Sequence, residues 1–205
     1  MQVTLLQHTS LTVCASAIRT CWQSFDKSDE GGQKDRDLID RVGNKFKHAS
    51  TLEHLVYTFY IQGISRALLQ ELSRHRLASP SVKSTRYTLK ELKAEEPFTC
   101  NEKTARAEKY LVFTGDARVD AMSIQALENV RLVLNEGIGN DKAKYCLPES
   151  YKTELTWTIN ARSLQNFLTL RSNKSALWEI QNLARALYAA LPQDHQYLFS
   201  VEEPQ

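Results

Sequence analysis

Three short runs of strand-forming residues, at 3–6, 55–61 and 155–159, lie far apart in this 205-residue chain, among segments of helical periodicity. The central run, Leu-Val-Tyr-Thr-Phe-Tyr-Ile, consists mainly of aromatic and β-branched residues, which pack well on a pleated sheet. The runs do not alternate regularly with helices, as strands do in a doubly wound parallel sheet. The sequence therefore predicts an α+β fold in which a β-sheet is flanked by helices.

Apolar spacing also predicts the helices. Their expected ranges are 11–21, 35–46, 64–75, 105–113, 119–134, 163–170 and 176–191. Gly63 is expected to end the central strand, and Pro80 disfavours a helical conformation at Ser79, so we expect an irregular loop after Arg76. Domains usually contain roughly 100–200 residues, and hydrophobic residues make up 42 % of this chain, so a single domain over residues 1–205 is predicted.

The charge balance argues against a protein that binds nucleic acid through bulk electrostatics. The chain has 26 Lys and Arg against 24 Asp and Glu, a formal net charge of +2, whereas such domains usually carry a large positive excess. No window approaches the ~20 apolar residues that span a bilayer, and the first residues lack the pattern of a secretory leader. We therefore expect a cytoplasmic protein with neither a nucleic-acid partner nor a membrane partner.

The cysteines and glycines exclude several kinds of site. No C-x-x-C spacing joins the four cysteines, which are expected to be reduced and structural: Cys14, Cys21, Cys100 and Cys146. Among only seven glycines, the nearest match to a dinucleotide-binding fingerprint is 137–139, and Lys142 stands where its third glycine would be. The sequence thus predicts neither a Rossmann nor a P-loop nucleotide site.

The most cationic stretch, residues 66–93, holds seven Lys and Arg against two Glu, a local balance of 7 − 2 = +5. Its centre is Arg74-His75-Arg76, expected at a helix end, where successive side chains point ~100° apart. Such a triplet suits a large ligand or several ligands that meet. The alternative is a solvated helix end whose arginines interact with the negative pole of the helix dipole.

A second polar group lies at 160–171. Arg162 and Asn166 are four residues apart and share a helix face, whereas Arg171 follows Phe167 by four and falls on the apolar side. A charge on the packed side needs a partner. That partner is either the carboxylate of Glu179 or an anionic ligand, and the sequence does not decide between them.

A third group, His48, Glu53 and His54, precedes the central strand. The spacing matches no zinc motif, and two histidines with one glutamate more often belong to a hydrogen-bonded turn, so no metal site is predicted. The residue types of a Ser-His-Asp or Cys-His hydrolase are present, but the chain has no G-x-S-x-G, which disfavours that alternative.

Arg74-His75-Arg76, followed after seven residues by Ser84, resembles the R-H-R-x7-S signature of flavin-dependent thymidylate synthases. Two further elements resemble motifs of the same family, in the same order. They are His48-x-Ser50-x-x-Glu53-His54 and Asn160-x-Arg162-Ser163-Leu164-x-Asn166-Phe167-x-x-x-Arg171. The likeness extends from residues 21–25 to residues 178–180.

The resemblance implies a homotetrameric α+β enzyme with the flavin-dependent thymidylate synthase fold, whose sites lie between subunits. Such an enzyme methylates dUMP to dTMP in nucleotide biosynthesis. It takes the methylene group from methylenetetrahydrofolate, and its reducing equivalents pass from NADPH through FAD. No metal and no cysteine nucleophile are required.

The resemblance also assigns roles to residues of this chain. The FAD set is His48, also near the folate, with Ser50, Arg74, His75, Arg76, Asn160, Arg162 and Asn166. The dUMP set is Glu71, Arg74, Ser84, Arg86, Lys144 and Arg171. Arg171 is the catalytic residue, because a cation beside uracil favours ionisation at N3 and raises the electron density at the carbon to be alkylated. Ser84 has no histidine beside it in sequence to activate it, so it is assigned to binding.

Three positions depart from the family pattern. Lys144 stands where the family commonly has arginine, which keeps the charge and loses the forked donors. Val82 replaces a frequent glutamate or glutamine, and Leu177 replaces a frequent glutamine.

A nucleic-acid-binding module that uses residues 66–93 is the alternative from another functional class, because its arginines and Tyr87 can contact phosphates and stack on bases. The low overall basicity disfavours it. Bound flavin would make the protein yellow, whereas a nucleic-acid binder would be colourless and strongly salt-sensitive.

Overall fold

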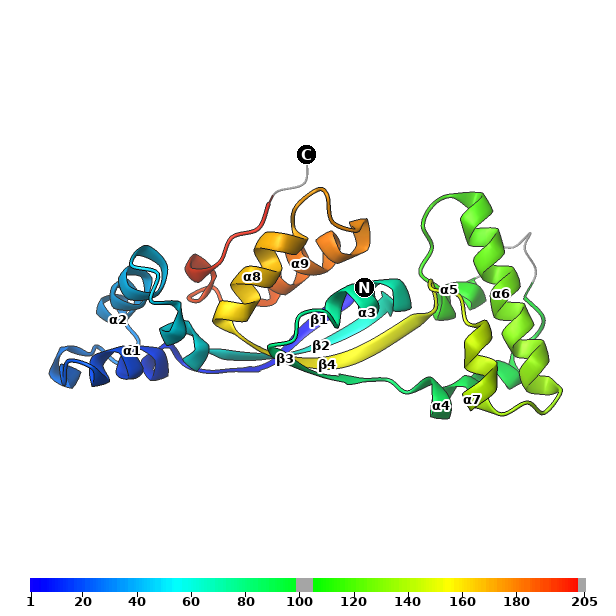
Figure 1. The fold of residues 1–205 in the computed structure, drawn as a ribbon, viewed down its shortest axis with the longest axis horizontal. Helices are drawn as coiled ribbons and strands as arrows, with labels where there is room; N and C mark the ends of the chain where they lie inside the picture. The colour runs from blue at the N-terminus through cyan, green and yellow to red at the C-terminus, as the bar shows by residue number, and fades with distance from the viewer. Residues whose placement is uncertain (99–104, 203–205) are drawn as a thin grey trace. The chain divides into compact units, whose positions relative to one another are not determined.

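The computed structural model describes residues 1–98 and 105–202. Its four described strands form one sheet in the order β1-β2-β4-β3 (Figure 1). The strands are β1 (Gln2–His8), β2 (Val56–Ser65), β3 (Ala78–Val82) and β4 (Lys152–Asn160). Helices pack against this sheet, so the predicted α+β class is confirmed.

The contacts within the chain divide it into two compact units. The first unit comprises residues 1–61, 72–81 and 156–205, and the second comprises residues 62–71 and 82–155. Three strands, β2, β3 and β4, contribute residues to both units. The single domain over 1–205 therefore stays a prediction.

The first unit has its core between the sheet and two C-terminal helices, α8 (Ala161–Arg171) and α9 (Trp178–Ala190). Alternate residues of β2, Tyr57, Phe59 and Ile61, are fully buried, as expected of a strand with one face against a core. Helix α9 packs against α8 and β1. The remaining elements of this unit are α1 (Leu11–Thr20), α2 (Gln33–Ile39), a π-helix (Asp40–Lys45) and 3-10 helices at Phe25–Lys27, Ala49–His54 and Gln196–Leu198.

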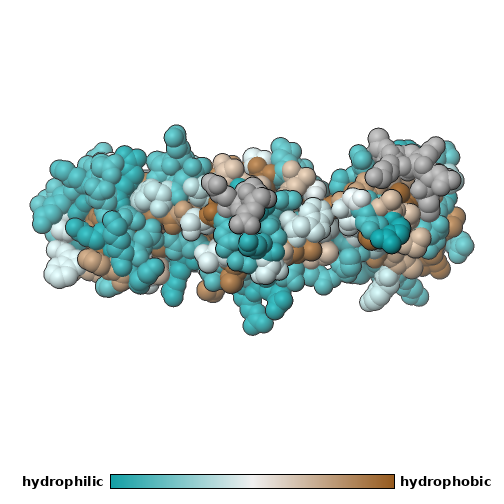
Figure 2. Space-filling view, turned by 90° about the horizontal axis from the view of Figure 1, so that it is seen from above, coloured by the Kyte–Doolittle hydropathy of each residue, from teal (hydrophilic) through white to brown (hydrophobic). Residues whose placement is uncertain are grey.

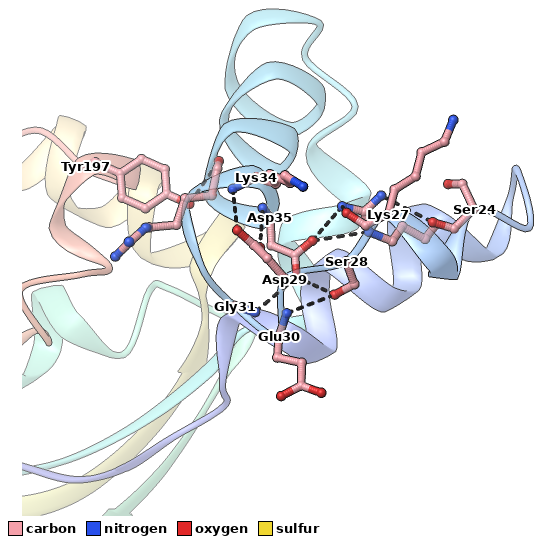
Figure 3. Close-up of polar contacts among 11 residues, drawn as sticks. Ser24, Lys27, Ser28, Asp29, Glu30, Gly31, Lys34, Asp35 and Tyr197 are labelled. Atoms are coloured by element: carbon pink, nitrogen blue, oxygen red, sulfur yellow. Dashed lines mark hydrogen bonds and ion pairs between the residues drawn. The ribbon is translucent and has the colours of Figure 1, made fainter.

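The loop before α2 is built around a buried ion pair (Figure 3). Arg19 Nη2 lies 2.6 Å from Asp35 Oδ1, and both side chains are buried. The other oxygen of Asp35 accepts from Ser28 Oγ at 2.6 Å and from the Gly31 amide at 3.0 Å. Burial alone would raise the pKa of Asp35, but the hydrogen bonds from Ser28, Arg19 and Gly31 outweigh it and lower that pKa. A polar loop is thereby fixed to α1.

The second unit has a core of its own, in which the long helix α6 (Ala117–Asn135) supplies Ile124, Leu127, Val130 and Leu134. Asp116 caps α6 by accepting from the amides of residues 118 and 119. The other elements are α3 (Arg66–Leu72), whose last residue belongs to the first unit, α4 (Thr85–Thr88), α5 (Ala105–Tyr110), α7 (Asn140–Ala143) and 3-10 helices at Leu89–Ala94 and Lys144–Cys146.

Several sequence predictions are wrong in detail. The segment after Arg76 is strand β3 and not an irregular loop, because Pro80 is tolerated at a sheet edge, where a missing N–H costs no ladder bond. Strand β2 runs on through Gly63, which takes a positive φ of 69°, to Ser65. The helix predicted over 35–46 changes to a π-helix after Ile39. A Cβ on Gly43 in that turn would lie only 2.8 Å from the Leu52 side chain.

The cysteines differ in their surroundings. Cys14, Cys21 and Cys146 are free thiols, of which only Cys14 is buried, so burial supports a structural role for that residue alone. Cys100 lies outside the described residues. None of the described helices is both long and apolar enough to cross a membrane.

Candidate active site

A cavity of about 800 Å³ opens in the first unit, a volume typical of sites for large ligands. It is lined by Arg74, His75, Arg76, Leu77, Arg162, Ser163, Asn166, Leu170, Arg171, Ser175 and Ala176. Four of these side chains are arginines, which stay charged at any physiological pH, and none is a carboxylate. The cavity is therefore suited to an anionic ligand.

The Arg74-His75-Arg76 triplet lies in a turn between α3, which ends at Leu72, and β3, which begins at Ala78. Its placement at a helix end is thus wrong, and the ~100° rotation between successive helical side chains does not apply. All three residues line the same cavity. The size of this cavity supports the large ligand that the triplet was predicted to bind.

Helix α8 and its cap supply the second polar group, residues 160–171, that the sequence analysis singled out. Asn160 caps the helix by accepting from the Ser163 amide at 2.9 Å, which fixes its first turn. Arg162 and Asn166 both line the cavity, as their shared helix face predicts. Arg162 Nη1 also lies 2.7 Å from Glu53 Oε1, but both side chains are about half exposed, and such pairs contribute little stability. Two of the three sequence groups therefore meet at the cavity, and Glu53 links the third to it.

Arg171 stands at the C-terminal end of α8 and is partly buried. Its Nε donates to His75 Nε2 at 3.0 Å. The sequence offered Glu179 or a ligand as the partner of Arg171, and the structure adds this imidazole. Glu179 is buried near the start of α9, with 3 % of its surface exposed.

Other residues assigned by resemblance do not line this cavity. His48 and Ser50 are exposed at the start of the 3-10 helix Ala49–His54, and Asn160 serves as the cap of α8. Lining residues that the sequence did not single out include Leu77, Leu170 and Ser175. Their only signal was their position next to Arg76 or shortly before and after Arg171.

Four of the dUMP residues belong to the second unit: Glu71, Ser84, Arg86 and Lys144. Ser84 precedes α4 without capping it through its side chain. The carbonyl of Arg86 accepts from Asn140 Nδ2 at 2.8 Å, which joins α4 to α7, the helix that leads directly to Lys144. Lys144 begins the 3-10 helix that follows α7, so α7 lies in contact with both the element of Arg86 and the element of Lys144.

Comparisons with known proteins show which family the chain belongs to. A family model described as thymidylate synthase complementing protein matches residues 4–195. The flavin-dependent thymidylate synthase of Wolinella succinogenes is 73 % identical over 203 residues, 99 % of each chain, and that of Campylobacter jejuni is 69 % identical over 97 % of this chain and 96 % of its own. The crystal structure of thymidylate synthase X from Helicobacter pylori with FAD and dUMP has a TM-score of 0.93 at 60 % identity, with 97 % of both chains covered. This chain belongs to the flavin-dependent thymidylate synthases, a family of enzymes.

Proposed function

We propose that the protein catalyses the reductive methylation of dUMP to dTMP for nucleotide biosynthesis, with methylenetetrahydrofolate as carbon donor and NADPH as reductant through bound FAD. The observation that carries this proposal is the large cationic cavity on which Arg74-His75-Arg76 and α8 converge. Two motifs that are distant in sequence line this one cavity. The Helicobacter relative, whose crystal structure holds FAD and dUMP, supports the same ligands here.

The residues of the cavity fit FAD. A dinucleotide carries a diphosphate, and guanidinium groups bind phosphate oxygens through paired, charge-assisted donors. Arg74, Arg76 and Arg162 would hold the phosphates, with His75 and Asn166 beside them. His48, Ser50 and Asn160 complete the set that the resemblance assigns. When bound, the flavin supplies the redox chemistry, and the protein supplies binding and orientation.

Arg171 is the residue that acts on dUMP. A guanidinium placed against the uracil ring stabilises the N3 anion, which increases electron density at the carbon that receives the methylene group. Glu71, Arg74, Ser84, Arg86 and Lys144 would bind and orient the nucleotide. Lys144 supplies its charge without the fork of an arginine.

We further propose one domain per chain, a homotetramer with sites shared between chains, and a cytoplasmic location. The face of the molecule in Figure 2 is mostly hydrophilic, with apolar groups gathered in places. Large side chains such as Trp22 and Tyr145 are more than four-fifths exposed. Exposed aromatic residues of this kind are enriched where subunits meet, which supports self-association.

The visible absorption spectrum of the purified protein tests the proposal first. A yellow protein that releases free FAD on denaturation, and that forms dTMP from dUMP with methylenetetrahydrofolate and NADPH, is the expected result. A colourless protein that takes up no flavin from excess FAD would reject it. Salt-sensitive binding of an oligonucleotide by that colourless protein would favour the nucleic-acid-binding alternative.

A further inference from the structure

The hydrogen bond between Arg171 and His75 determines which nitrogen of the imidazole carries the proton. Arginine remains protonated in proteins, so its Nε can only donate. Nε2 of His75, 3.0 Å away, is therefore the unprotonated, accepting nitrogen. The imidazole is neutral, with its proton on Nδ1.

His75 is held in turn by a row of buried rings. Its ring lies edge-on to Phe167, with 4.8 Å between centroids and 70° between planes, and Phe167 lies 5.3 Å from the Trp157 ring. Phe167 is fully buried and Trp157 is 1 % exposed. Phe167 also precedes Arg171 by one helical turn of α8, so both ends of the Arg171–His75 contact rest on one rigid helix.

We propose that His75 is a positioning residue for Arg171. By accepting the Nε–H, it restricts rotation of the guanidinium and sets the plane in which that group meets the substrate. The inference rests on the proposed function, in which Arg171 stabilises ionised uracil, because that stabilisation depends on the direction of the donors. This role is additional to the contact with FAD that the resemblance assigns to His75.

Two substitutions at this position separate hydrogen bonding from packing. His75→Gln keeps an oxygen that can accept from Arg171, whereas His75→Phe keeps a ring against Phe167 and removes the acceptor. We expect kcat for dTMP formation at saturating FAD to fall less than tenfold in the Gln variant and about 10- to 100-fold in the Phe variant. The dissociation constant of dUMP, measured by calorimetry on the FAD-loaded protein, should rise in the same order. A Phe variant that matches or exceeds the Gln variant would overturn the inference.

A double-mutant cycle then isolates the pair. His75→Phe is made both in the otherwise unchanged chain and in Arg171→Ala, and the flavin spectrum confirms that each variant is loaded. Positioning predicts that His75→Phe weakens dUMP binding only when Arg171 is present. Equal losses in both backgrounds would show that His75 acts through FAD or through the fold, which overturns the inference. An unchanged protein that neither binds dUMP nor forms dTMP would instead reject the proposed function, and the inference with it.

Discussion

At the scale of single residues, the proposed chemistry depends most on Arg171. Arg171→Ala should abolish dTMP formation while the protein still binds FAD, because the other three arginines of the cavity remain. Arg171→Lys should retain part of the activity, since the charge stays and the fork is lost. The measurements are dTMP production, flavin content and melting temperature for the same variants.

The alternative role for Arg171, as a structural partner of Glu179, predicts a different result. If Arg171 serves chiefly to pair with Glu179, the single variants should lose stability, and Arg171→Leu combined with Glu179→Leu should restore both the melting temperature and the activity. Restored dTMP formation in that double variant would contradict the catalytic role.

His195 should make folding stability depend on pH. It is 1 % exposed, and its Nδ1 lies 2.8 Å from the Tyr57 hydroxyl. Burial lowers the pKa of His195 to about 4, whereas an unfolded histidine titrates near 6.5. Below that value the unfolded chain binds the proton more readily. The contribution of neutral His195 is therefore complete above pH ~6.5 and is lost as the pH falls toward 4.

Urea unfolding at pH 7.5 and 5.5 measures this contribution. From pH 7.5 to pH 5.5, the free energy of unfolding of the unchanged protein should fall by about 1–1.5 kcal/mol more than that of His195→Gln. His54 is exposed, so His54→Gln should keep the pH dependence of the unchanged protein. The same pH slope in the His195 variant as in the unchanged protein would contradict the assignment.

At the scale of elements, the buried pair of Arg19 and Asp35 ties α1 to the start of α2. Asp35→Ala leaves the Arg19 charge buried without this partner and removes the acceptor of Ser28 and Gly31, so we expect a loss of about 3–5 kcal/mol in the free energy of unfolding. Arg118→Ala is the matched control, because its pair with Asp116 has a similar distance of 2.9 Å but a 91 % exposed arginine side chain. Chemical denaturation should show a far smaller effect there, and equal losses would contradict the argument.

Elements whose apolar residues repeat regularly over many positions could be predicted from the sequence. Short helices and the edge strand β3 could not. The central strand and α6 were found because their apolar residues repeat over many positions. Strand β3 was missed because four of its five residues are exposed, which leaves no buried alternation to detect. The four-residue helices α4 and α7 are too short to show a period.

The candidate site shows the same limit. The resemblance pointed to the triplet and to the residues of α8, and residues of both line one cavity. The hydrogen bond between Arg171 and His75 crosses 96 positions of sequence. No local pattern specifies such a contact, because it depends on how the turn before β3 packs against α8.

For the whole molecule, complementation between inactive chains tests the shared sites. Arg76 and Arg171 line one cavity of the same chain, so co-assembled Arg76→Ala and Arg171→Ala chains should stay inactive. Arg86 lies in the second unit. Oligomers that mix Arg171→Ala chains with Arg86→Ala chains should recover up to about a quarter of the activity if each site takes Arg171 and Arg86 from different chains. The measurement is dTMP formation by mixed oligomers of confirmed mass. Inactive mixtures of folded chains in both cases would contradict shared sites.

Strand β3 imposes a fixed spacing within the R-H-R-x7-S motif, because it lies between Arg76 and Ser84. Five of the seven residues between Arg76 and Ser84 are extended, and an extended strand rises ~3.3 Å per residue. The strand alone thus separates its two ends, Ala78 and Val82, by ~13 Å. Inserting one residue into this strand would also turn every following side chain to the opposite face. The seven residues between Arg76 and Ser84 therefore set both a distance along the chain and the face of the strand on which each side chain lies. Inserting or deleting one of them should be more damaging than substituting most of them.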